Sequence, residues 1–212
     1  MTRHPILPAR TRGFSMIEVL VSLMIIVLGL LGLAGLQARI QQSEFESYQR
    51  AQALILLQDM VERISLHRVT AQCFRFTDVT SGTPYLGLSN TYTPACTAST
   101  SNNNTQAINA LTEWNSLLQG AAETKGGASV GAMVGARGCV SYTTGSELKD
   151  STGATIPETG VYTVAVVWQG MTDTVVPTLP DGTTLNCANG LYDAADKKRR
   201  AVYMTFRQAY LK

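Results

Sequence analysis

The feature that most constrains the fold of this chain is an apolar segment, residues 19–36, which contains no charged side chain. It is about long enough to cross the hydrocarbon core of a bilayer as a helix. A leader, residues 1–13, precedes it and carries arginines but no acidic residue, which predicts that this end stays in the cytoplasm. Glu18 lies directly before the apolar segment. Because a carboxylate is costly in lipid, Glu18 is expected to mark a functional site.

The position of Gly13 argues against an ordinary secretory signal. In such a signal the small residue at the cleavage site follows the apolar run, so cleavage removes the run. Here Gly13 precedes the run. Cleavage after Gly13 would therefore leave the apolar helix on the mature chain, with Phe14 as its first residue.

The basic leader, Gly13, Phe14 and a glutamate four residues after Phe14 together resemble the type IV pilin signal. The resemblance implies cleavage after Gly13 by a prepilin peptidase and methylation of the new amino group of Phe14. It also implies the pilin fold, an α+β fold in which a long N-terminal helix packs on an antiparallel β-sheet. We expect Glu18 to act in subunit assembly by pairing with the Phe14 amine of a neighbouring subunit.

The N-terminal third is similar, more narrowly, to the minor pilins of the type IV pilus modification protein family, PilV. Residues 13–22 and 29–37 carry this similarity, and the segments around Trp114, 166–170 and 200–204 carry it more loosely. The resemblance implies a minor pilin that primes pilus assembly at the pilus tip and is not an enzyme. Its partners would be other minor and major pilins, the prepilin peptidase and the inner membrane, with no cofactor.

On this interpretation the chain spans the inner membrane once with a periplasmic head, and joins the pilus on the cell surface after assembly. One alternative is a minor pseudopilin of a type II secretion system, which calcium-binding carboxylates such as Asp193 and Asp196 would favour. Another is an adhesive or DNA-binding pilin, for which residues 197–200 form the candidate basic patch.

We expect no nucleic-acid partner. Charged residues make up 15% of the chain and the net charge is only +2. One short basic run, residues 197–200, also neutralises few phosphates. We interpret this run as a solvated strand edge protected by charge.

Helical periodicity continues beyond the apolar segment and predicts one helix from Phe14 to about Arg68. We divide it into a transmembrane and assembly segment, residues 14–36, and an amphipathic segment, residues 37–68, followed by a head, residues 69–212. A helix of this length would extend about 80 Å, far more than a membrane requires. The stripe expected to pack on the sheet consists of Ile40, Ala51, Leu54, Leu57, Val61 and Ile64, widened by Leu56 and Met60.

The head pattern predicts a second helix over residues 107–118, with Trp114 as a core anchor. Residues 99–105 have no apolar periodicity and are expected to form a mobile loop. Alternation and β-branched composition predict antiparallel strands over residues 134–143, 160–169 and 199–207.

The four cysteines form an even, widely spaced set beyond the membrane segment, which predicts two disulfides in an oxidising compartment. No metal site is expected, because no two cysteines stand at the short spacing of zinc ligands. Three pairings are possible. We favour Cys73–Cys96, which closes the shorter connection after the long helix, and Cys139–Cys187, which ties an irregular loop to the central strand.

The sequence contains no convergent set of catalytic groups. His67 is the only histidine outside the leader, and we interpret it as a helix-end group favoured by the helix dipole. Residues 150–153 faintly resemble an aspartic-protease loop, but no partner loop of the same kind exists, so we expect a turn.

Overall fold

The computed structural model describes residues 13–121, 124–125, 128–129 and 133–209, and the leader of residues 1–12 lies outside the described residues. The chain divides into two units, Met1–Phe45 and Glu46–Lys212, and the boundary falls inside helix α1, Met16–Leu66. The helix begins two residues after Phe14 and ends just before Arg68. The continuous helix expected from the periodicity is therefore confirmed.

In the first unit every residue from 13 to 41 is exposed, so the apolar part of α1 has no cover from its own unit. A helix satisfies its backbone hydrogen bonds internally, which is what a segment surrounded by lipid must do. Among the described residues, α1 is the one helix long and apolar enough to cross a membrane.

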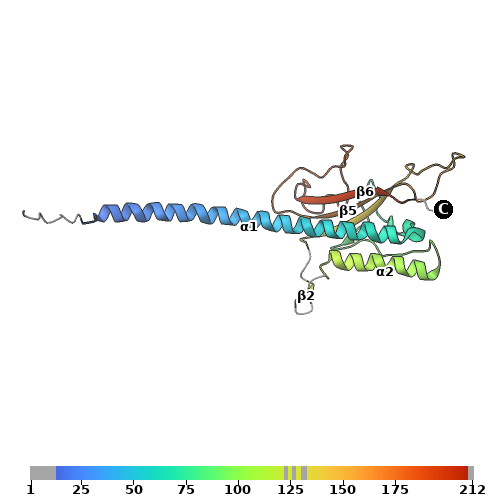
Figure 1. The fold of residues 1–212 in the computed structure, drawn as a ribbon, viewed down its shortest axis with the longest axis horizontal. Helices are drawn as coiled ribbons and strands as arrows, with labels where there is room; N and C mark the ends of the chain where they lie inside the picture. Colours follow the sequence, from blue (N-terminus) through green and yellow to red (C-terminus); the bar gives the residue numbers. More distant parts are fainter. Residues whose placement is uncertain (1–12, 122–123, 126–127, 130–132, 210–212) are drawn as a thin grey trace, which may run out of the picture. The chain divides into compact units, whose positions relative to one another are not determined.

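The second unit places the last turns of α1 and helix α2 against a four-stranded antiparallel sheet of order β1-β4-β5-β6 (Figure 1). This is the pilin-like α+β arrangement expected from the resemblance. The elements after α1 are the 3₁₀ segment η1 (Arg68–Phe74), β1 (Leu86–Gly87), α2 (Ser101–Leu118), β2 (Thr124–Lys125), β3 (Ala128–Ser129), β4 (Arg137–Thr143), β5 (Val161–Gln169) and β6 (Arg199–Arg207). β2 and β3 form a separate two-stranded antiparallel sheet.

The face of α1 that packs on the head differs from the expected stripe. Leu57 and Ile64 are buried as expected, whereas Ala51 and Leu54 are exposed. The buried residues of α1 are Gln49, Ala53, Leu57, Met60 and Ile64. Spacing alone could not locate this face, because α1 also carries apolar residues on the side that remains exposed.

Helix α2 begins earlier than expected, and the prediction of a mobile loop over residues 99–105 is wrong. Thr100 caps the helix, because its side chain accepts a hydrogen bond from the Asn103 amide. Asn104 then ties the helix start to the preceding chain, accepting from the Ser99 amide at 2.9 Å and donating to the Ser99 carbonyl at 2.8 Å. Local capping by polar side chains thus replaces the apolar periodicity that this stretch lacks.

Trp114 is the core anchor that the sequence predicted. It is fully buried, and its indole Nε1 donates to the Leu56 carbonyl of α1 at 2.9 Å. The ring lies directly over Gly138 of β4, where an added Cβ would stand 2.1 Å from a ring carbon of Trp114. Gly138 therefore allows α2 to approach the sheet closely.

The second unit contains two disulfides, Cys73–Cys96 and Cys139–Cys187, which are the two pairs that we favoured. Cys73–Cys96 links η1 to the chain just before α2. Cys139–Cys187 links β4 to the long connection between β5 and β6.

We predict that Gly138→Ala lowers the free energy of unfolding by about 1–3 kcal/mol, because the new methyl group overpacks against Trp114. Thermal unfolding of the detergent-solubilised full chain measures the effect. Thr205→Ala, at an exposed position of β6, is the control and should change stability by less than about 0.5 kcal/mol. Equal stability of the two variants would contradict the close packing described for Gly138.

Candidate functional site

The start of α1 is fixed by a cap on Ser15. The Ser15 hydroxyl accepts from the Ile17 amide at 3.3 Å, and the Ser15 carbonyl accepts from the Glu18 amide at 3.0 Å. A serine followed three residues later by a glutamate is a helix-start pattern that our sequence interpretation did not use. Glu18 therefore lies in the first turn, where the helix dipole favours a carboxylate.

The bond between Gly13 and Phe14 lies just before the helix, and both residues are exposed. A peptide bond outside regular structure is accessible to a protease without unfolding of a helix. The sequence-predicted cleavage site, the amine that would follow it and Glu18 are thus all placed within the first turn of α1 or directly before it.

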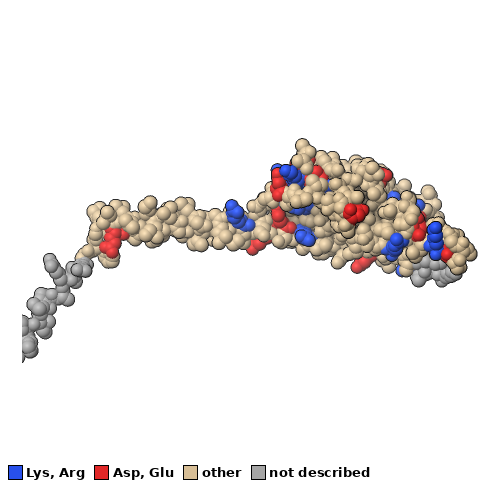
Figure 2. All heavy atoms as spheres, turned by 90° about the horizontal axis from the view of Figure 1, so that it is seen from above, with Lys and Arg blue, Asp and Glu red and all other residues tan. Residues whose placement is uncertain are grey.

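Glu18 is the only charged residue between positions 13 and 38. Figure 2 shows one acidic patch near the start of the first unit, followed by a long uncharged surface. Within the described residues Glu18 forms no ion pair. In water this carboxylate is hydrated but the apolar surface beside it stays exposed, and in lipid the apolar surface is covered but the carboxylate is not compensated.

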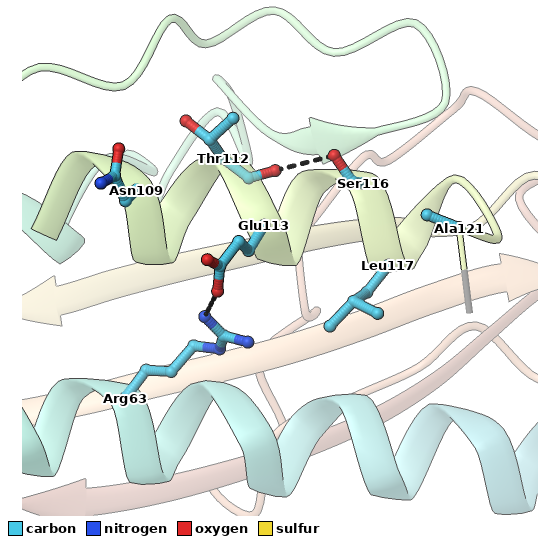
Figure 3. A pocket seen from close by; sticks show the side chains of 7 residues that line it. All are labelled: Arg63, Asn109, Thr112, Glu113, Ser116, Leu117 and Ala121. Carbon is cyan, nitrogen blue, oxygen red and sulfur yellow. Dashed lines mark hydrogen bonds and ion pairs between the residues drawn. The ribbon is translucent and has the colours of Figure 1, made fainter. Parts of the chain in front are cut away.

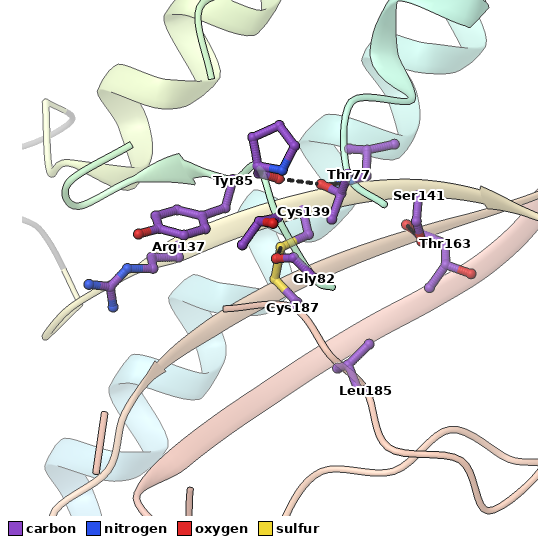
Figure 4. Close-up of a disulfide and its surroundings, with 12 residues drawn as sticks. Thr77, Gly82, Tyr85, Arg137, Cys139, Ser141, Thr163, Leu185 and Cys187 are labelled. Atoms are coloured by element: carbon purple, nitrogen blue, oxygen red, sulfur yellow. Dashed lines mark hydrogen bonds between the residues drawn. A yellow bond between two sulfur atoms is a disulfide. The ribbon is translucent and has the colours of Figure 1, made fainter. Parts of the chain in front are cut away.

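The Cys139–Cys187 disulfide lies on one face of the sheet, beside a cleft of about 380 Å³ (Figure 4). Val140 and Val164 point to the α1 side, so the alternate residues Cys139 and Ala165 point to the other face. Among the described residues that line the cleft, the Thr, Ser and Asn side chains offer hydroxyls and an amide, and none of the lining residues is a histidine.

Two aspartates at the cleft, Asp78 and Asp181, hold turns. Asp78 accepts from the amides of Ser81 and Thr80, and these bonds, Ser81 first, lower the pKa of its carboxyl. Asp181 accepts from the Thr183 hydroxyl and amide, which likewise lower its pKa. Both carboxylates are therefore used locally to shape the loops around the cleft.

A second hollow, of about 470 Å³, lies between α1 and α2 (Figure 3). Its one cation, Arg63, is paired with Glu113 at 2.9 Å and with Asp59 at 2.8 Å. Arg63 also donates to the Ala110 carbonyl. The charge of Arg63 is satisfied within the fold, so this hollow offers no unpaired cation from its described lining to a ligand.

The basic run of residues 197–200 is not simply a solvated edge, and that prediction is wrong for Arg199. Arg199 is fully buried, and its Nη2 lies 2.5 Å from Asp196 Oδ2. Its Nη1 donates to the carbonyls of Leu185 and Cys187. The signal in the sequence was the aspartate three residues before the arginine, which supplies the counter-charge that a buried guanidinium requires.

The two carboxylates that would have favoured a calcium site are both used by the fold. Asp196 pairs with Arg199, and Asp193 accepts from the amides of Ala195, Lys197 and Lys198. These bonds, Lys198 first, lower the pKa of Asp193. Among the described residues no group of three His, Cys, Asp or Glu side chains is placed to hold a metal ion.

The two isolated polar groups singled out in the sequence have structural roles. His67 follows α1, and its Nδ1 lies 2.8 Å from the Arg63 carbonyl, as a helix-end group does. Asp150 accepts from the amides of Thr152 and Ala154, which confirms the turn expected over residues 150–153.

Comparison with known families gave one match. Residues 8–34 match the family described as the prokaryotic N-terminal methylation motif. The matched stretch contains Gly13, Phe14 and Glu18 together with most of the apolar segment. Searches of curated proteins and of solved structures found no match to the chain.

We predict that Asp196→Asn destabilises the head by about 3–5 kcal/mol, because it leaves the buried Arg199 charge without its counter-charge. Chemical denaturation of the purified full chain measures the loss. Asp193→Asn, which removes the charge of a half-buried carboxylate whose hydrogen-bond partners are backbone amides, should cost less. The double variant Asp196→Leu, Arg199→Met should recover most of the loss, and failure to recover it would argue that the pair is needed for more than charge balance.

Proposed function

We propose that this chain, a type IV pilin-like or pseudopilin-like prepilin by its N-terminal motif, is a minor pilin of the type IV pilus modification protein family, PilV. It would prime pilus assembly and occupy the pilus tip. The observation that carries the proposal is the processing motif at the start of a helix that is exposed and apolar in its first half and packs on an α+β head in its second half. Pilin-like proteins are structural and not enzymes.

The motif implies processing by a prepilin peptidase and assembly with pilins, and the hydrophobic helix is consistent with a membrane or pilus location. We propose that residues 1–13 are removed, that residues 14–36 span the inner membrane before assembly, and that residues 37–68 present the head, residues 69–212, in the periplasm. The two disulfides support a periplasmic head, because such bonds persist in oxidising compartments.

The structural roles of two carboxylates near the C-terminus, Asp193 and Asp196, favour a type IV pilus over type II secretion. A calcium site near residues 193–196 would have supported a pseudopilin. In this chain Asp193 holds backbone amides and Asp196 neutralises Arg199, so neither is available as a ligand without loss of those contacts.

The proposed mechanism of assembly uses Glu18 as the register point between subunits. After cleavage the methylated amine of Phe14 is the nearest cation that a neighbouring subunit could bring to Glu18. An ion pair formed away from water is strongly weakened when one partner is removed. The pair would therefore fix one axial position of each subunit relative to the next.

We predict that Gly13→Val leaves the leader attached to the chain, because a branched side chain does not fit a small-residue cleavage site. Mass spectrometry of the N-terminus of the membrane-bound protein distinguishes the processed from the unprocessed form. The wild-type chain should begin at a methylated Phe14. Any other start would count against the proposed processing.

We predict that Glu18→Ala leaves membrane insertion and cleavage largely intact but lowers incorporation into pili, since the loss of one partner of a desolvated pair costs about 3–5 kcal/mol. The measurement is the ratio of the protein in sheared pili to the protein in membranes. Glu44→Gln is the matched control, since Glu44 is an exposed acidic residue of α1 beyond the apolar segment. Equal incorporation of Glu18→Ala and wild type would reject the assembly role of Glu18.

A further inference from the structure

Arg137, the first residue of β4, is a buried cation held against two aromatic rings. Only 8% of the residue is exposed. Its guanidinium carbon lies 5.3 Å from the centre of the Tyr85 ring and 5.0 Å from the centre of the Tyr192 ring. Figure 4 shows the Tyr85 ring beside the Arg137 side chain, which extends away from the Cys139–Cys187 disulfide.

The carbonyl of Gly135 holds this cluster together. It accepts a hydrogen bond from the Tyr192 hydroxyl at 2.8 Å and a longer one from Arg137 Nη1 at 3.4 Å. The Arg137 guanidinium also interacts with the Tyr192 hydroxyl, whereas its Nε is buried without any hydrogen-bond partner in the described ranges.

The charge of Arg137 is not balanced inside the described part of the fold. No carboxylate of the described residues lies within ion-pair distance of it. Arg199, which is also buried, has Asp196 as its ion-pair partner. Ring faces attract a guanidinium but compensate only part of the hydration that burial removes, so most native buried charges are paired. Arg137 departs from that rule.

Three exposed apolar residues adjoin the cluster along the chain or through a backbone hydrogen bond. Val134 and Leu191 each precede one of its members in the chain, and the Leu88 amide donates to the carbonyl of Ala136, next to Arg137. Leu88, Val134 and Leu191 are 50%, 46% and 45% exposed. Together with Tyr85, Arg137 and Tyr192 they form what we call the Arg137 patch.

We infer that the Arg137 patch is a docking site for an acidic side chain of a neighbouring pilin subunit. Arginine and tyrosine are the residue types that carry most binding energy at protein interfaces. The planar guanidinium matches a carboxylate, and the apolar rim would exclude water from the pair. This inference rests on the proposed function, because the partner is taken to be a pilin, but the patch itself lies in the head and not in the N-terminal motif.

The test places a photo-reactive amino acid at Leu191 in the full-length chain, expressed in cells that assemble the pilus. Irradiation of intact cells should give a cross-link to another pilin, and mass spectrometry of the linked peptide should identify an acidic residue beside the cross-linked position. Arg137→Met should reduce the yield about tenfold or more, the loss expected when an interface anchor is removed. Arg137→Lys keeps the charge but not the planar fork, so it should give an intermediate yield.

Leu148 is the matched control position, because it is also 45% exposed but follows the opposite end of β4. Cross-linking from Leu148 should not depend on Arg137. Glu123→Gln removes the only acidic residue between Glu113 and Glu147, and so tests whether the chain supplies its own counter-charge.

The inference is overturned if the Leu191 cross-link yield does not depend on Arg137, if no pilin is linked, or if Glu123→Gln reproduces the loss. If Arg137→Met does not fold, as judged by disulfide formation and thermal unfolding, Arg137→Lys decides, and a wild-type yield from this variant rejects the inference. The proposed function is judged separately. Absence of the wild-type chain from sheared pili rejects that function, whereas its presence with cross-links that ignore Arg137 rejects only the docking site.

Discussion

A single helix, α1, carries apolar side chains that need cover in two different surroundings, and the rest of the structure depends on this constraint. From residue 16 to residue 41 the helix offers only exposed side chains, most of them apolar. From Gln49 to Ile64 the same helix buries one face against its own head. The first part requires lipid or neighbouring helices to cover it, whereas the second part obtains its cover from the sheet and α2. The second part is thus covered within the chain itself, whereas the first part is not.

The parts of the fold that local patterns determine could be predicted from the sequence. The processing motif consists of a few residues at fixed spacing. The β-branched and aromatic residues of β5, a central strand, and β6, an edge strand, predict both strands. The two cysteine pairs could be chosen among the three possible pairings from the lengths and positions of the connections that they close. The motif and the strands depend on neighbours in the sequence, and the disulfide pairs on the positions of four cysteines, so one sequence was enough.

The parts that depend on tertiary partners were predicted poorly. The buried face of α1 could not be chosen among several apolar rows, because the choice depends on where α2 and the sheet lie. The start of α2 depends on side-chain caps from Thr100 and Asn104 and not on apolar periodicity. Arg199 looked like a surface charge because its burial depends on the fold, in which the carbonyls of Leu185 and Cys187 accept from its guanidinium. The Arg137 cluster joins residues far apart in sequence and gave no local signal.

The two disulfides also set an order of events for the head. Both need an oxidant, and on the proposed route the cysteines meet one only after they have crossed the membrane. Helices and hairpins form in microseconds, whereas oxidative pairing takes seconds or longer. A newly exported chain would therefore spend a period anchored by α1, with its secondary structure formed and its long connections not yet cross-linked by disulfides. During that period the thiol oxidases of the compartment, rather than the chain itself, would determine how soon a subunit with a finished head becomes available for assembly.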